Sequence, residues 1–225
     1  MSLTIAVDGP SGSGKSTAAK IVSHRLDLKY IDTGAMYRAV TLAWINSDCD
    51  SITEEKISGL AADIEMEFGR IKRDGRQNIY LNDQEISSRI RRQDIDRHVS
   101  DIASIPEVRE IMLEKQRRFA REKGIIMDGR DIGSRVLPDA DLKIYLTASL
   151  DVRARRRYRE LLERGEDISL AEVRKELQKR DKKDKNRSHS PLVRADSAIT
   201  INSDNLSAEE VADKIIELAE SEMRE

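Results

Sequence analysis

The sequence predicts an α/β fold of three layers, in which a mainly parallel five-stranded sheet lies between helices and carries a small antiparallel insert. Three observations lead to this prediction. Short apolar runs alternate with longer helical patterns along most of the 225 residues. A glycine-rich loop directly follows the first apolar run, and an Asp-Gly pair separates two strand-like runs near residue 75.

The apolar runs predict five strands, of which the first reads as buried, because each is short and leads into turn residues or a helical pattern. These runs cover residues 3–7, 28–32, 124–128, 142–147 and 198–201. The helical patterns cover residues 15–26, 35–46, 109–122, 151–164, 169–182 and 207–222. Strands that alternate with helices in this way favour a parallel sheet that is covered on both faces.

Residues 64–86 break this alternation. Asp74-Gly75 lies between two strand-like runs and is typical of a hairpin turn. We therefore expect an antiparallel insert over residues 62–90, within an insert region that extends to about residue 106. The core of a single domain would then comprise residues 1–61, 107–150 and 191–225.

Composition excludes several classes of protein. The 40 Lys and Arg residues nearly balance 42 Asp and Glu residues, which argues against a disordered chain. The single cysteine, Cys49, excludes an internal disulfide framework and a multi-cysteine metal site. No apolar run approaches the roughly 18 residues of a membrane span, and the first residues lack the features of a signal peptide. We therefore expect a soluble, cytoplasmic protein with no membrane partner.

The overall charge balance hides a basic segment. Residues 151–190 contain 14 Lys and Arg residues against nine Asp and Glu residues. A locally basic segment in an otherwise acidic chain indicates a specific anionic ligand more than a coat of nucleic acid. The alternative interpretation is a charged helix that is simply exposed to solvent.

Residues 9–16, GPSGSGKS, match the phosphate-loop pattern G-x-x-x-x-G-K-[ST], with a strand predicted before and a helix after. The context indicates a fold of the P-loop NTPase type. The glycines let backbone N–H groups converge, and the helix N-terminus adds partial positive charge. Lys15 is expected to contact the β- and γ-phosphates of ATP, and the Ser16 hydroxyl to hold Mg²⁺. The residues expected to bind ATP in this loop are Gly9, Ser11, Gly12, Ser13, Gly14, Lys15, Ser16 and Thr17.

The phosphate loop alone leaves the second substrate open. A GTPase would usually carry an N-K-x-D motif after a strand, and no such motif is present. Motor ATPases generally need a longer chain. The remaining classes are a kinase for a small molecule and a nucleotide-dependent switch that binds a protein partner. A switch needs no pocket for a second small substrate.

Three further motifs narrow the choice. They are DTGAMYR at residues 32–38, DGRDIG at 128–133 and RDKKDKNR at 180–187. Together with the phosphate loop they resemble the bacterial cytidylate kinases, and the resemblance runs to the C-terminal helix. The insert is similar to the one that distinguishes these enzymes from shorter adenylate-kinase relatives. Lys182, Lys183 and Lys185 stand where relatives can carry Arg or Asp.

The resemblance implies a Mg²⁺-dependent transfer of the γ-phosphoryl group of ATP to CMP or dCMP, by a monomer that does not bind nucleic acid. It places Arg38, Arg130 and Arg187 on the CMP phosphate, a task that suits forked guanidinium groups. Each arginine alone could equally form a surface ion pair. The resemblance assigns the sugar to Arg180 and Asp184, which by spacing alone would form an ordinary i,i+4 ion pair.

The resemblance further implies that Ser100, Arg109 and Asp131 read the base. On local pattern alone, Ser100 would be a helix cap and Arg109 a first-turn residue. Thr33, in the first of the three motifs, is expected to contact CMP. The expected catalytic residues are Lys15, Arg130, Arg187 and Asp128, with Asp128 orienting either the magnesium shell or the acceptor phosphate.

The basic segment 151–190 resembles the mobile lid of nucleotide kinases, which would clamp ATP and exclude water. Arg153, Arg156 and Arg157 share one helix face. Spacing cannot choose among them, and we take Arg157 as the ATP contact. A kinase for another acceptor, such as UMP or shikimate, remains the nearest alternative.

Overall fold

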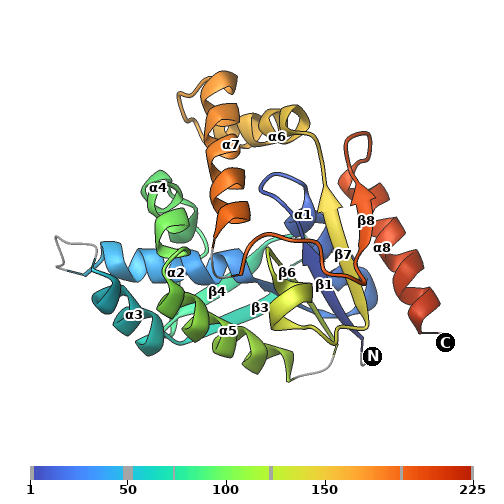
Figure 1. Ribbon diagram of the computed structural model, residues 1–225, viewed down its shortest axis with the longest axis horizontal. Helices are drawn as coiled ribbons and strands as arrows, with labels where there is room; N and C mark the ends of the chain where they lie inside the picture. The colour runs from blue at the N-terminus through green and yellow to red at the C-terminus, as the bar shows by residue number, and fades with distance from the viewer. Residues whose placement is uncertain (1–2, 48–52, 73, 122–123, 188–189, 224–225) are drawn as a thin grey trace.

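Figure 1 shows the computed structural model of the protein, which describes residues 3–47, 53–72, 74–121, 124–187 and 190–223. Cys49 lies outside the described residues. A five-stranded sheet has the order β2-β6-β1-β7-β8, and every neighbouring pair is parallel. Its strands are β1 (Thr4–Asp8), β2 (Lys29–Asp32), β6 (Ile125–Gly129), β7 (Leu142–Thr147) and β8 (Ile199–Asn202). The expected parallel sheet is therefore confirmed.

Alternate residues of the strands supply two separate cores, one on each face of the sheet. Ile5 and Val7 of β1 pack with α1 (Lys15–Leu26) and α8 (Ala208–Glu222). Ala6, between them, faces the second core with α2 (Thr33–Ile45) and α5 (Pro106–Ala120). Strands β1, β2 and β6 are buried along nearly their whole length, which explains why they read as continuous apolar runs. The edge strand β8 is mostly exposed.

The small antiparallel sheet comprises β3 (Met66–Ile71), β4 (Gln77–Leu81) and β5 (Gln84–Glu85). The hairpin turn expected at Asp74-Gly75 joins β3 to β4, and the Gly75 amide donates to Lys72 O at 2.9 Å. Phe68 of β3 meets Phe119 of α5 edge to face, so the insert shares the α2 and α5 core.

Two helices in this part of the chain were not predicted, α3 (Glu54–Asp63) and α4 (Gln93–Ile102). The expected description of residues 62–90 as antiparallel is also incomplete, because a 3₁₀ turn, η1 (Arg89–Arg91), ends it. The helix expected from residue 109 begins at Pro106 instead, since proline is favourable in the first turn of a helix.

The basic segment folds as a helical pair, α6 (Leu150–Glu163) and α7 (Leu170–Asn186), which stands at the top of the view in Figure 1. The two helices share a small apolar cluster of their own that includes Leu161 and Leu177. The arrows of β7 and β8 point toward this pair, so α6 and α7 lie at the carboxyl edge of the sheet. None of the described helices is long and apolar enough to cross a membrane.

The close approach of Gly9 to β7 yields a stability prediction. A Cβ at Gly9 would lie 2.0 Å from the backbone oxygen of Leu146, and that strand cannot yield. Gly9→Ala is expected to lower the free energy of unfolding by about 2–3 kcal/mol in urea denaturation. Gly59→Ala in α3 is the control, because its Cβ meets nothing within 4 Å. It should leave stability equal or raise it by about 0.5–1 kcal/mol. Equal stability of the Gly9 variant and the parent protein would contradict the packing described here.

Candidate active site

A cleft of about 800 Å³ opens where β1, β2 and β6 end, between the sheet and the α6–α7 pair. Among the residues that the structure describes, thirteen Lys and Arg side chains and nine Asp and Glu side chains line it. Most residues expected to form the site lie on its wall, whereas Gly9 and Ser13 do not. Those on the wall are Ser11, Gly12, Gly14, Lys15, Ser16, Thr17, Thr33, Arg38, Ser100, Arg109, Asp128, Arg130, Asp131, Arg157, Arg180, Asp184 and Arg187.

The glycine-rich loop turns sharply between β1 and α1. Gly12 and Gly14 have φ values of 76° and 92°, which side-chain-bearing residues rarely adopt. Lys15 is the first residue of α1, and its Nζ donates to Pro10 O at 3.3 Å. Burial, followed by repulsion from Arg130, lowers the pKa of Lys15 to about 7. An anion in the loop would therefore stabilise the charged form of this amine.

Two arginines of α6 bind the backbone of the loop. Arg153 Nη1 donates to Ser11 O at 3.1 Å, and Arg156 Nη1 donates to Ser13 O at 3.3 Å. Arg153 is buried, and it also pairs with Asp181 of α7 at 2.7 Å. The helix face that these residues share with Arg157 thus anchors α6 to the loop backbone.

Asp128 ends β6 at the base of the cleft. Its two carboxylate oxygens accept from the Tyr30 hydroxyl at 2.7 Å and from Ser16 Oγ at 2.8 Å. Burial, and then the neighbouring Asp32 carboxylate, raise the pKa of Asp128. A hydroxyl and a carboxylate are the hard oxygen donors that suit Mg²⁺, which usually takes one or two protein ligands beside phosphates and water. The residues present therefore fit the expected metal.

Asp8, at the end of β1, orients the segment that follows β6. Its carboxylate oxygens each accept a backbone N–H at 2.8 Å, from Ile132 and Gly133. These residues begin η2 (Ile132–Val136), a wide helical turn. Burial raises the pKa of Asp8 to about 7. The contact fixes the backbone immediately after Arg130 and Asp131 at the edge of the cleft.

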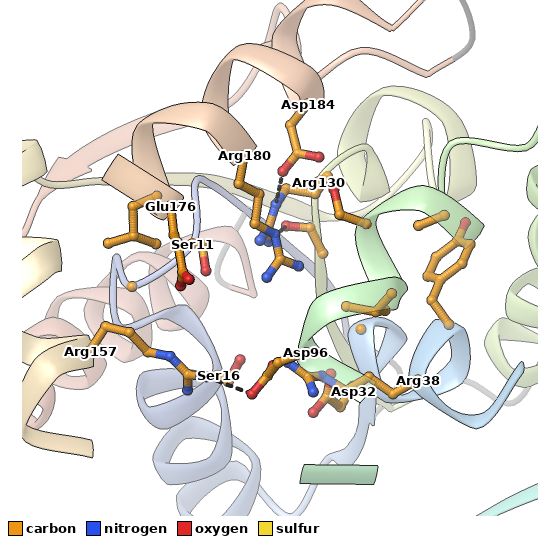
Figure 2. Close-up of a pocket in the computed structure, with 18 of the residues that line it drawn as sticks. Ser11, Ser16, Asp32, Arg38, Asp96, Arg130, Arg157, Glu176, Arg180 and Asp184 are labelled. Carbon is orange, nitrogen blue, oxygen red and sulfur yellow. Dashed lines mark hydrogen bonds and ion pairs between the residues drawn. The ribbon is translucent and has the colours of Figure 1, made fainter. Parts of the chain in front are cut away.

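Two arginines pair with Asp184 of α7, one from the segment after β6 and one from the C-cap of α7. Arg130 Nε donates to Asp184 at 3.0 Å, and Arg187 lies 3.8 Å from the same carboxylate. Figure 2 shows Arg180 reaching into the cavity beside Arg130. Burial and the nearby Arg130 lower the pKa of Arg180 to about 10. The expected alternative of a surface ion pair between Arg180 and Asp184 does not hold, because Asp184 is buried and its ion pairs are with Arg130 and Arg187.

Several of these guanidinium groups have unused donors. The buried Nε groups of Arg109, Arg180 and Arg187, and Nη2 of Arg187, find no hydrogen-bond acceptor among the described residues. A buried donor without an acceptor is unfavourable, by about 1–3 kcal/mol for a neutral group and more for a charged one. Positive charge and free donors together make this part of the cleft a site for an anionic, polar ligand.

At the α5 end of the cleft, Arg109 and Asp131 form a buried ion pair of 2.6 Å. Arg109 also donates to Ala103 O at 3.1 Å and lies 5.4 Å from the centre of the Tyr37 ring. Ser100 lies on the cleft wall from inside α4, so it is not a helix cap.

The wall opposite Arg180 is formed by ion pairs between distant segments. Asp96 of α4 accepts from Arg38 of α2 at 2.5 Å and from Arg157 of α6 at 2.8 Å. Figure 2 shows Arg157 and Asp96 meeting across the cavity. Arg91 pairs with Asp32 at 2.8 Å, next to this cluster.

Comparison with known proteins agrees with this geometry. Residues 5–221 match the family described as cytidylate kinase. The chain belongs to the cytidylate kinase family. It is 45% identical over 218 residues to the cytidylate kinase of Listeria monocytogenes serotype 4a, covering 97% of this chain and 96% of the relative. It is likewise 45% identical to the cytidylate kinase of Caldanaerobacter subterraneus over 217 residues, or 96% and 94% of the two chains. A solved structure of an uncharacterized Eubacterium ventriosum protein shares the fold, with a TM-score of 0.54 and 13% identity over 97% and 99% of the chains.

The motifs by which the sequence resembled the cytidylate kinase family meet around one cleft, but several residues that line or support it were not predicted. Tyr30, Arg91 and Asp96 are the main ones. A tyrosine in a buried strand needs a hydrogen-bond partner for its hydroxyl, so the sequence could have indicated that Tyr30 contacts a polar group. The sequence offered no such indication for Asp96 and Arg91, because their partners lie 58 to 61 residues away along the chain.

Proposed function

We propose that this protein transfers the γ-phosphoryl group of ATP reversibly to CMP and dCMP, giving ADP and CDP or dCDP. The observation that carries the proposal is the set of buried guanidinium donors without acceptors on Arg109, Arg180 and Arg187, beside a phosphate loop. A nucleoside monophosphate would supply what they lack, since it has a dianionic phosphate, sugar hydroxyls and a polar base edge. The family of the chain names CMP as that acceptor.

In this proposal Lys15 contacts the phosphates of ATP, and Arg38, Arg130 and Arg187 hold the phosphate of CMP. The second pKa of a phosphate monoester is near ~6, so the acceptor oxygen is already largely ionised at neutral pH. The reaction then needs no strong general base. Catalysis comes from holding donor and acceptor in line and from placing fixed positive charge where negative charge spreads over the transferred group.

Ser16 and Asp128 are the residues that would hold Mg²⁺ with the nucleotide. When bound, the ion neutralises charge on the phosphates of ATP. The Tyr30 hydroxyl donates to one Asp128 oxygen and keeps it in place, and Ser16 Oγ donates a hydrogen bond to the other. Loop, strand and metal ligands are thereby fixed before the substrates bind.

The finer parts of the proposal concern the rest of CMP and the chain itself. Arg180 and Asp184 would bind the sugar, and Ser100, Arg109 and Asp131 the base, with Thr33 at the edge of the acceptor site. Arg157 would contact ATP from a lid formed by residues 151–190, and the acceptor would enter beside the insert region 62–106. We also place the protein in the cytoplasm as a monomer.

Steady-state assays of ADP formation with a panel of acceptors test this function. CMP and dCMP should support turnover, whereas UMP and shikimate should support little. Lys15→Met keeps the length of the side chain and removes its charge, so kcat for CMP should fall by at least ~10²-fold with the fold intact. ADP formation that is independent of any monophosphate would favour a nucleotide-dependent switch. Normal turnover in a folded Lys15 variant would remove this amine from the mechanism.

Base selectivity tests the assignment of Arg109 and Asp131. Cytosine offers an amino donor that a carboxylate can accept, whereas uracil offers an oxygen that a carboxylate repels. Sites built on such hydrogen bonds can discriminate by 10⁴-fold or more. Asp131→Asn keeps an acceptor for Arg109 and adds an amide donor, so the ratio of kcat/KM for CMP to that for UMP should fall at least about tenfold.

Glu110→Gln is the matched control for this experiment, because Glu110 is the neighbour of Arg109 but pairs with Arg135 on the exposed surface. It should leave the CMP to UMP ratio unchanged. An unchanged ratio in Asp131→Asn would place the base elsewhere.

A further inference from the structure

Asp96 joins three parts of the molecule through a single carboxylate. It projects from α4 in the insert, its Oδ1 accepts from Arg38 of α2, and its Oδ2 accepts from Arg157 of α6. Arg164, at the end of α6, lies 3.9 Å from Oδ2. The side chain of Asp96 is 18% exposed, and those of Arg38 and Arg157 are 12% and 21% exposed, so the cluster is largely shielded from water.

The terminal nitrogens of both arginines already donate to acceptors within the protein. Arg38 Nη1 donates to Ile90 O at 3.0 Å while Nη2 donates to Asp96. Arg157 Nη1 pairs with Glu160 at 3.0 Å while Nη2 donates to Asp96. In the proposed function these are the arginines that meet the phosphates of CMP and ATP, respectively. Both substrates would therefore approach guanidinium groups that already hold Asp96.

A phosphate dianion and a carboxylate cannot share a poorly hydrated guanidinium without strong repulsion. We propose that Asp96 stands in for the substrate phosphates in the free protein, competes with them for Arg38 and Arg157, and thereby couples the binding of the two substrates. The inference rests on the proposed function, which supplies the two phosphates.

The contacts of Asp96 with both arginines would couple the binding of the two substrates. One carboxylate holds both arginines at once, so a phosphate that takes Arg38 repels Asp96 from Arg157 as well. The second substrate then meets an arginine that is already released. By linkage, each substrate must raise the affinity for the other by the same factor.

Asp96→Asn tests the proposal, because the amide keeps the shape of the side chain and one acceptor oxygen but removes the charge. Asp101→Asn is the matched control. Asp101 lies on the same helix and joins the insert to the lid through Lys183, but it touches neither Arg38 nor Arg157. Calorimetric titrations would measure the Kd of CMP and of the β,γ-imido analogue of ATP, each alone and in the presence of the other.

In the parent protein, each ligand should tighten the binding of the other by about fivefold or more. In Asp96→Asn, each ligand alone should bind about 3- to 10-fold more tightly, and the mutual effect should fall below about twofold. The midpoint of thermal unfolding without ligand should also fall, since two largely shielded arginines lose a counter-charge. Asp101→Asn should keep the affinities and the coupling of the parent protein.

Unchanged or weaker binding of the single ligands in Asp96→Asn would overturn the proposal, since Asp96 would then be a passive or a supporting residue. If each ligand binds Asp96→Asn more tightly but the coupling between them is undiminished, the Asp96 contacts with Arg38 and Arg157 are not the cause of the coupling. If the parent protein binds the ATP analogue but no CMP, the proposed function fails and this inference fails with it. If the parent protein binds CMP but Asp96→Asn does not show the expected changes, the proposed role of Asp96 is rejected and the proposed function stands.

Discussion

Positive charge gathered into one cleft is the constraint on which the rest of this structure depends. Lys15, Arg130 and Arg180 lie close enough for their charges to oppose one another, and the pKa values of Lys15 and Arg180 fall as a result of burial and this repulsion. Such a cluster persists only if the protein supplies acceptors and counter-charges until a ligand does. Asp96, Asp131 and Asp184 supply them, each from a different part of the chain.

The topology of the sheet makes this arrangement possible. The carboxyl ends of β1, β6 and β2 lie side by side, so the phosphate loop, Asp128 and Asp32 meet at one edge although they are far apart in sequence. The α6–α7 pair has a small apolar cluster of its own and is tied to the loop by Arg153 and Arg156. Much of the contact across the cleft is therefore polar, and polar contacts can be exchanged for those of a ligand.

Local patterns in the sequence were sufficient for the individual strands of the sheet, the phosphate loop and the hairpin, because each depends on neighbouring residues. The spacing of Ile95, Val99 and Ile102 could have indicated α4, but the charged residues between them obscured it. Contacts between distant segments left no pattern from which both partners could be identified. The Tyr30 hydroxyl bonds a carboxylate 98 residues away, and Asp184 pairs with Arg130 instead of Arg180 one turn away. Burial in the cleft decides these partners, and burial depends on the whole fold.

Thermal unfolding in the presence of CMP or cytidine tests most directly whether the cleft is built to bind a phosphate group. The two ligands share base and sugar and differ in the dianion alone. With CMP at about 100 times its Kd, the gain in stability should be about 2.7 kcal/mol, and the midpoint should rise by several degrees. Cytidine at the same concentration should raise it by less than about a third as much, because it leaves the arginines without an anion. Equal stabilisation by cytidine and CMP would contradict a cleft organised around phosphate charge.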